Sequence, residues 1–239
     1  MTFLELVREL QLKGGVAGPT IVTTVGQTGL TNRLVGFITN AWQEIQLMRN
    51  DWLFMKTEAS KVLVVGQSLY GVQLDWGLTD VRKFDPKDWR IENLLITNDK
   101  AFMGVLSYPR WREKYGANIG PSNARPSELT EIYNAAAYPS QKAIQFNAMP
   151  DLAYQVTFSY EKIATILSAD VSPTADAQVP SMPADYHMAI VWKALEYYGY
   201  YESAGEVIAQ AQRQFAVLNR AMTSTQTLYE TEVQPCPLA

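Results

Sequence analysis

Hydrophobic residues recur at helical spacing near both ends of the chain. Close to the N-terminus, one apolar face predicts a short helix and a second predicts a longer one. The first face is formed by Phe3, Leu6, Val7 and Leu10, and the second by Leu30, Leu34, Phe37, Ile38, Ala41, Trp42, Ile45 and Met48. Two more helices are predicted by Met188, Val191, Leu195 and Tyr198, and by Val207, Ala211, Phe215, Leu218 and Met222. We expect Trp42 to lie in the core.

Local signals predict where these helices begin and end. Thr2 is followed three residues later by a glutamate, which indicates a capping box, and Gly14 favours the end of that helix. Pro183 is expected in the first turn of the third helix. Ser203, again followed three residues later by a glutamate, predicts a second capping box before the last helix.

The middle of the chain has the spacing of β-strands. Tyr154–Glu161 alternates apolar and polar residues, so we expect a half-buried strand paired with Lys142–Asn147 across an Ala-Met-Pro-Asp turn. Trp89–Thr97 and Lys100–Tyr108 flank Asn98-Asp99, which predicts a hairpin with a two-residue connection. Three shorter elements are also expected: strands at Lys61–Val65 and Thr20–Val25, and a helix at Pro109–Tyr115.

These patterns predict an α+β protein, in which a bundle of about four helices from both chain ends carries an antiparallel β insertion. The expected segments are the N-terminal helices at 1–52, the β insertion at 53–164, a long loop at 165–182, the C-terminal helices at 183–222 and an extended tail at 223–239. A loop as long as 165–182 is usually functional or mobile.

Composition narrows the class of protein. The 239 residues are 47% hydrophobic and 18% charged, which is typical of a globular protein with a substantial core. The formal net charge of -4 argues against a general grip on nucleic-acid phosphates or anionic membranes. No secretory signal and no membrane-spanning run is visible, so we expect a soluble, unprocessed protein made in the cytosol.

Residue types that carry catalysis are sparse. His187 is the only histidine and is expected to be structural or partly exposed. Cys236 lies between two prolines in the predicted tail, where it is expected to be inert. Gly14–Gly18 lacks the Lys-Ser/Thr pair of a phosphate-binding loop. The acids Asp75, Asp80, Asp85 and Asp88 lack calcium-loop spacing. We therefore expect no catalytic residue, no cofactor and no metal, although a carboxylate-only or lysine-based site would leave no visible pattern.

One short cluster interleaves cations with aromatic rings: Arg110-Trp111-Arg112, followed by Lys114-Tyr115. Proteins that bind single-stranded nucleic acid use this combination. Because the chain is acidic overall, an amphipathic helix at a protein interface is the favoured interpretation, and nucleic-acid recognition is the alternative.

Two blocks of sequence carry a family resemblance. The first comprises Thr2–Leu6, Gly15–Pro19, Val25–Gly29, Arg33–Val35, Ala41-Trp42, Ile45-Gln46, Asp51-Trp52 and Phe54. The second comprises Val179–Pro183, Tyr186-His187, Ile190–Ala194 and Tyr197-Tyr198 through Glu202. Both resemble the head-to-tail adaptor (connector) proteins of tailed bacteriophages, in particular short-tailed ones. The β middle of the chain matches that family only by its position.

The resemblance implies a structural virion protein that forms a homo-oligomeric ring, of twelve subunits in related connectors, in the neck between head and tail. The ring would be assembled in the host cytoplasm and would contact no membrane. It would dock beneath the portal protein, receive tail nozzle or fibre proteins on its other side, and pass double-stranded DNA without sequence preference.

The same resemblance indicates two sets of contact residues. Because C-terminal segments of that family commonly reach the portal, the candidate portal contacts are Leu228, Tyr229, Val233, Pro235, Pro237 and Leu238. The candidate inter-subunit contacts are Gln27, Arg33, Arg110 and Trp111. Two alternatives stay open: a phage neck or tail-completion protein at another ring position, and a small binding module or enzyme unrelated to phage.

Overall fold

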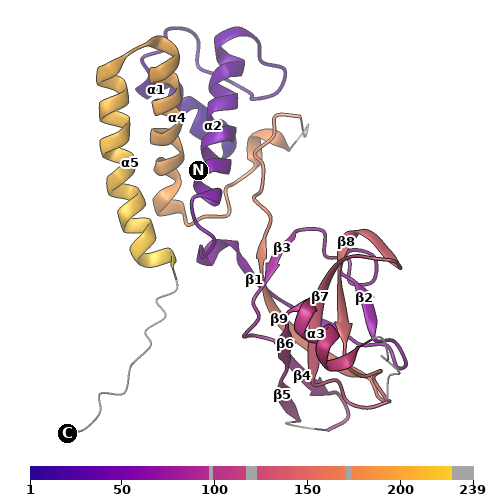
Figure 1. Cartoon of the computed structure of the whole chain (residues 1–239). Helices are drawn as coiled ribbons and strands as arrows, with labels where there is room; N and C mark the ends of the chain where they lie inside the picture. Colours follow the sequence, from indigo (N-terminus) through magenta and orange to yellow (C-terminus); the bar gives the residue numbers. More distant parts are fainter. Residues whose placement is uncertain (97–98, 117–122, 171–173, 228–239) are drawn as a thin grey trace, which may run out of the picture. The chain divides into compact units, whose positions relative to one another are not determined.

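The computed structural model describes residues 1–96, 99–116, 123–170 and 174–227. The chain forms two compact units (Figure 1). Unit 1 contains Met1–Met55 together with the chain from Ala164 onward, and unit 2 contains Lys56–Ile163. Unit 1 is helical and unit 2 holds two β-sheets, which confirms the predicted α+β class with a β insertion between helices from both chain ends.

Unit 1 is built around its third helix. Its helices are α1 (Phe3–Lys13), α2 (Gly29–Leu47), α4 (His187–Glu202) and α5 (Gly205–Gln226). Helix α4 packs against α1, α2 and α5, and lies between α5 and α2 in Figure 1. Eight residues of α4 are buried. Helices that are far apart in the sequence therefore share one hydrophobic core around α4.

Both N-terminal helices form as predicted. Thr2 and Glu5 make the reciprocal capping box, with Thr2 Oγ1 accepting from Glu5 N–H at 3.3 Å and Glu5 Oε2 accepting from Thr2 N–H at 2.8 Å. Trp42 is 1% exposed, and its Nε1 donates to Thr165 Oγ1 at 3.2 Å. Buried Gln46 also holds Thr165, donating to its carbonyl at 2.9 Å and accepting from its N–H at 2.8 Å. These bonds fix the chain where it returns to unit 1.

The predicted capping box at Ser203 is wrong. Ser203 ends α4 in the left-handed conformation, with φ +56°, and makes no side-chain cap for α5, whose N-cap residue is Ala204. The reason is the tightness of the turn: Gly199 packs so closely on α5 that a Cβ added there would lie 2.7 Å from Ile208 Cγ1. The short connection therefore uses Ser203 to reverse the chain rather than to begin the next helix.

Two further boundaries differ from the prediction. Thr20–Val25 is a loop rather than a strand, because its polar groups bond to helices and to Asp176: Arg8 Nε donates to Ile21 O at 2.6 Å, and Asp176 Oδ1 accepts from Thr24 N–H at 2.6 Å. Helix α5 continues to Gln226, so the predicted tail does not begin at residue 223. Buried Met222, near the end of α5, supports this extra turn.

The first sheet of unit 2 is arranged around β9 (Tyr154–Lys162). Strand β1 (Lys56–Val62) pairs with β9 along its whole length. On the other side of β9 lie β3 (Val81–Phe84) and β4 (Arg90–Asn93), one after the other, and β5 (Lys100–Phe102) pairs with β4. All of these pairs are antiparallel. The alternation that predicts β9 is confirmed by its alternating burial.

The second sheet has the order β2 (Leu69–Gly71), β8 (Tyr138–Phe146), β7 (Glu128–Ala135) and β6 (Gly104–Leu106). Strands β6 and β7 are parallel, unlike the antiparallel pairs predicted throughout the insertion. The connection between them contains the predicted helix, α3 (Tyr108–Tyr115), and a crossover of this length permits a parallel pair.

One predicted strand pairing is wrong and one is confirmed with shorter strands. Strand β9 does not pair with β8, because the Pro150-containing connection carries the chain from one sheet to the other. The hairpin of β4 and β5 exists, but its strands are shorter than predicted. Its connection starts at Leu94 rather than at Asn98, which lies outside the described residues. Of the predicted strand Lys61–Val65, only Lys61 and Val62 belong to β1, which starts at Lys56 and ends at Val62.

Aromatic rings fill the interior of unit 2. Trp89 stacks on Phe158 with ring centroids 4.3 Å apart, and Trp76 stacks on the same phenylalanine at 5.3 Å. Phe84 and Tyr70 extend the cluster through edge and stacked contacts. Such rings bury large apolar areas, so this cluster is expected to supply much of the stability of unit 2.

Ser203 provides a test of the α4–α5 turn. Because a residue with φ near +56° strains any side chain, Ser203→Gly should raise the free energy of unfolding by about 1 kcal/mol. Ser203→Ala, the matched control, keeps the strain and should give no such gain. Urea unfolding followed by far-ultraviolet circular dichroism measures both. Loss of stability in Ser203→Gly would contradict the turn and favour a capping role.

Candidate assembly surfaces

A polar network joins the three helices α2, α4 and α5. Lys193 on α4 forms ion pairs with Glu44 on α2 at 3.0 Å and with Glu196 on α4 at 3.0 Å. Gln212 on α5 donates to Glu196 Oε1 at 2.9 Å, and the Tyr197 hydroxyl donates to Glu44. One cation therefore ties α4 to α2, and its carboxylate partner extends the link to α5.

The network sets the protonation of its members. Burial alone would lower the pKa of Lys193, but hydrogen bonds to Glu44 and Glu196 outweigh it, so the pKa is raised. Burial acts to raise the pKa of Glu196, yet bonds from Gln212 and Lys193 leave it lowered. Both groups stay charged near neutral pH, which keeps the helices in fixed positions relative to one another.

His187 is a structural histidine, as expected. It is 2% exposed, and its Nδ1 lies 2.6 Å from the Met1 amino group while its Nε2 lies 3.0 Å from Met182 O. Since an ammonium group can only donate, Nδ1 accepts and Nε2 donates to the carbonyl. Burial is the main cause that lowers the pKa of His187. The ring therefore joins α4 to the start of the chain in its neutral form.

The first two predicted inter-subunit residues lie near the start of α2. Gln27 is half-buried and donates to Val25 O at 3.4 Å. Arg33 is exposed, with its guanidinium 4.4 Å from the centre of the Tyr201 ring. Tyr201 is itself 47% exposed, next to Phe37 at 6.4 Å between ring centres. This combination of an arginine and exposed aromatic rings is typical of protein interfaces.

The other two lie on α3 in unit 2. Trp111 is 1% exposed and contacts the Tyr115 ring at a tilt, with ring centres 4.6 Å apart, so its side chain belongs to the interior and does not present a surface. Arg110 is exposed. Lys114, from the same cluster, pairs with Glu128 on β7 at 2.6 Å, and this bond is the main cause that lowers the pKa of Glu128. The cluster thus anchors α3, and Arg110 stays a proposed contact.

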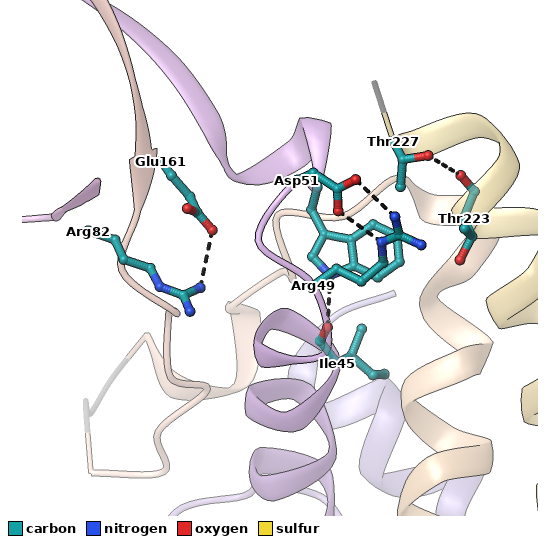
Figure 2. A network of polar contacts seen from close by, with 8 residues as sticks. Ile45, Arg49, Asp51, Arg82, Glu161, Thr223 and Thr227 are labelled. Carbon is teal, nitrogen blue, oxygen red and sulfur yellow. Dashed lines mark hydrogen bonds and ion pairs between the residues drawn. The ribbon is translucent and has the colours of Figure 1, made fainter. Parts of the chain in front are cut away.

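The end of α5 is fixed beside Trp52. Trp52 is fully buried, its Nε1 donates to Ile45 O at 2.9 Å, and it forms an antiparallel bridge with Thr227. Arg49 pairs with Asp51 at 2.8 Å (Figure 2), with its guanidinium 5.9 Å from the Trp52 ring centre. The last described residue, Thr227, is therefore held next to Trp52.

Several predicted contact residues lie outside the described part of the chain: Leu228, Tyr229, Val233, Pro235, Pro237 and Leu238, as well as Cys236. The predicted loop at 165–182 is described except for 171–173. It is attached to the helices, since Thr39 Oγ1 donates to Leu167 O at 2.8 Å and Gln178 O accepts from Phe3 N–H at 2.7 Å. Leu167 and Met182 add buried apolar contacts.

An apolar surface that the sequence patterns do not reveal lies at one end of the first sheet. The ends of β1 and β4 flank Tyr154, since Leu63 N–H donates to Tyr154 O at 2.8 Å and Asn93 pairs with Tyr154. The exposed aliphatic residues there are Val62, Val64, Val65, Leu94, Leu95, Ile96 and Leu152. In a sequence, such apolar residues look the same whether they are buried in a strand or exposed at a contact surface. Most of them are therefore assigned to strands from the sequence alone. Contiguous exposed apolar residues commonly mark protein contacts.

The described residues offer few features typical of a metal-binding or ligand-binding site. Among these residues, no group of three or more His, Cys, Asp or Glu side chains is placed to hold a metal ion, and no helix is long and apolar enough to cross a membrane. The glycine-rich loop lines an open hollow of about 400 Å³ together with Arg8 and Glu9. Its backbone is held by α1, as Gln11 Nε2 donates to Pro19 O at 3.0 Å.

The described part of the chain combines a helical bundle that displays arginine and aromatic side chains with a β unit that has exposed aliphatic residues, and both features are typical of protein contact surfaces. A search of curated proteins finds no significant match. The family model of the SU10 adaptor protein matches residues 1–235. The chain therefore belongs to the SU10 adaptor protein family, a family of phage head-to-tail adaptors, which confirms the resemblance. The match includes the β middle, which the resemblance covers only by position.

The buried His187 predicts a pH dependence of stability. Because its pKa is lowered in the folded chain from 6.5, the unfolded chain binds more protons, and stability falls as the pH drops below about 6.5. Urea unfolding between pH 7 and pH 5 should show this loss, with a slope of at most about 1.4 kcal/mol per pH unit.

His187→Gln is the control, because glutamine keeps polar atoms but does not titrate. It should be less stable at pH 7 and should lose the slope in this range. The lowered pKa values of Glu196 and Asp176 act only below their ordinary 4.5 and 3.8, so they do not contribute there. Equal slopes for the wild-type protein and the variant would contradict the role of His187.

Proposed function

We propose that this chain forms a ring, of twelve copies as in related connectors, between the phage portal and the tail. The single observation that carries the proposal is the family match across residues 1–235. It is supported by the packing of α1, α2, α4 and α5 into one bundle, which offers long exposed helix faces to neighbouring copies. The role is structural: the ring continues the DNA channel from the head and includes no catalytic step.

The charge of the chain fits passage of DNA. A formal net charge of -4 on each copy, repeated around a ring, weakens the adhesion of phosphates to the channel. Double-stranded DNA then slides through without sequence preference and with little friction. In this role the protein belongs to the neck of the virion and is assembled in the host cytoplasm.

The C-terminal segment is the proposed link to the portal. It starts at Thr227, which the bridge to buried Trp52 holds in place. The apolar and proline residues proposed to contact the portal are Leu228, Tyr229, Val233, Pro235, Pro237 and Leu238. Prolines restrict the free chain and so reduce the entropy lost when such a segment is ordered on a partner. Tail nozzle or fibre proteins are the proposed partners on the other side of the ring.

Removal of residues 228–239 tests the portal link. Because Trp52, Met222 and Thr227 all remain, the truncated chain should keep its helical content and unfolding midpoint. It should fail to bind the portal ring of the same phage. Mass photometry of each protein mixed with that portal ring measures the result, and the full chain should add about a dozen copies to each portal.

Cys236→Ser is the matched control, since the thiol is assigned no role and this variant should bind like the unchanged chain. Normal portal binding by the truncated chain would overturn the role of the C-terminal segment. A full chain that stays apart from the portal ring would overturn the adaptor proposal itself.

A further inference from the structure

Helices α2 and α5 lie on opposite sides of α4 and point the same way. Arg33, early in α2, reaches Tyr201 at the end of α4, while Glu44, late in α2, pairs with Lys193. Helix α5 also runs antiparallel to α4, because Gln212 bonds to Glu196 and Thr225 to Tyr186. Two helices that are both antiparallel to α4 are parallel to each other, and Figure 1 shows α4 between them.

Each of these two helices has an outer stripe on the side away from the hydrophobic core, although the long Arg33 side chain still reaches Tyr201 near the end of α4. The outer stripe of α2 is Gly29, Arg33, Gly36, Asn40, Gln43 and Leu47, and that of α5 is Glu206, Gln210, Arg213, Val217, Arg220 and Ser224. Both follow the same alternating spacing of four and three residues, which is the spacing of helices that pack along their length. Leu47 is 57% exposed and Val217 is 66% exposed, so both stripes include uncovered apolar side chains.

Contacts through α4 place the two stripes at matching heights. Arg33 is level with Tyr201, and Glu206 follows a few residues later at the start of α5. Lower in the bundle, Lys193 contacts both Glu44 and the Phe215 ring, so the α2 residues near 44 are level with the α5 residues near 215. A second copy that is displaced perpendicular to the helix axes, with no shift along them, therefore brings its Glu206 next to Arg33 of the first copy.

The charges at this height are complementary. Arg33 and Glu206 have opposite charges, are both exposed, and form no ion pair within the described part of the chain. At the other positions of the two stripes, no charge faces a like charge: the remaining pairs are Gly36 with Gln210, Asn40 with Arg213, Gln43 with Val217, and Leu47 with Arg220. Opposite charges that are unpaired in one copy favour a partner that supplies both.

Gly36 gives a separate reason to expect a neighbour. A glycine inside a helix costs about 1 kcal/mol relative to alanine. No atom of the chain lies within 4 Å of the position that a Cβ would take, so packing within the chain does not require a glycine here. A glycine on an outer stripe allows the backbone of a second helix to approach closely.

We propose that the outer stripe of α2 in one copy packs, in parallel, on the outer stripe of α5 in the next copy, with Arg33 paired to Glu206. The partner is a second copy of this chain, and the inference rests on the proposed ring. Because the two stripes differ and lie on opposite sides of α4, the contact is heterologous, so each copy offers one free stripe to the next, as a contact between neighbours in a ring requires.

A charge swap tests the pairing. Arg33→Glu and Glu206→Arg each place like charges together and should weaken the association between copies by about tenfold or more, whereas the double variant should restore it. Glu58→Arg, an exposed reversal on β1, is the matched control and should associate normally. Mass photometry on portal rings counts the bound copies, and circular dichroism checks that each variant is folded. A double variant as weak as the single ones would overturn the pairing.

Cysteine crosslinking separates the contact from the function. In a Cys236→Ser background, Arg33→Cys combined with Glu206→Cys should form, on portal rings under mild oxidation, a ladder of covalent multimers. Either cysteine alone should give no ladder, because the two positions differ. Copies that gather on the portal without a ladder would overturn this contact and leave the adaptor proposal standing. Failure of the Cys236→Ser chain itself, with Arg33 and Glu206 in place, to gather on the portal would overturn the adaptor proposal.

Discussion

The burial of α4 against helices from the other end of the chain is the constraint on which the rest of the molecule depends. Ile190, Val191 and Ala194 are fully buried in a core shared with Phe3 and Leu6. Since apolar burial is the main favourable term in folding, the bundle forms only when the chain ends meet. The β insertion must then begin and end at neighbouring points, and Lys56 and Glu161, near its two ends, are indeed paired across β1 and β9.

The same constraint explains the polar contacts around α4. Gln46 and Trp42 use their side chains to hold Thr165, the point at which the chain returns. Lys193 then links α4 to α2 and, through Glu196, to α5. A half-satisfied buried network would be costly, and here each charged partner is bonded. The result is a bundle whose outer helices keep a fixed register, which any regular contact between copies requires.

Features that depend on residues close in the sequence are predicted well, and features that depend on residues far apart in the sequence are missed. Helices depend on neighbouring residues, so the capping box at Thr2, the core position of Trp42 and the helix α3 are confirmed. Strand partners depend on distant residues, so the pairing of β9 with β8 was wrong. The pattern at Ser203 fits a helix start in sequence, but the close approach at Gly199 decides the turn.

The candidate contact residues show the same difference between what the sequence reveals and what only the structure reveals. Arg33 is exposed and Gln27 is half-buried near the start of α2, and their role as inter-subunit contacts stays a prediction. Trp111 looks equally suitable for contact, yet only the packing of α3 on β7 shows that it is buried. The apolar end of the first sheet is missed because exposure of Leu95 and Val64 depends on which strand ends lie together.

The bridge between Trp52 and Thr227 has a consequence for the strength of a multivalent contact. Residues 228–239, tethered at that point, extend at most about 40 Å even when fully stretched. A binding groove within that radius meets the segment at the high effective concentration of a tethered ligand, and a groove beyond it meets none. In the proposed ring, binding of one such segment would bring its neighbours within reach, so that many weak attachments could together hold strongly without any single segment binding tightly.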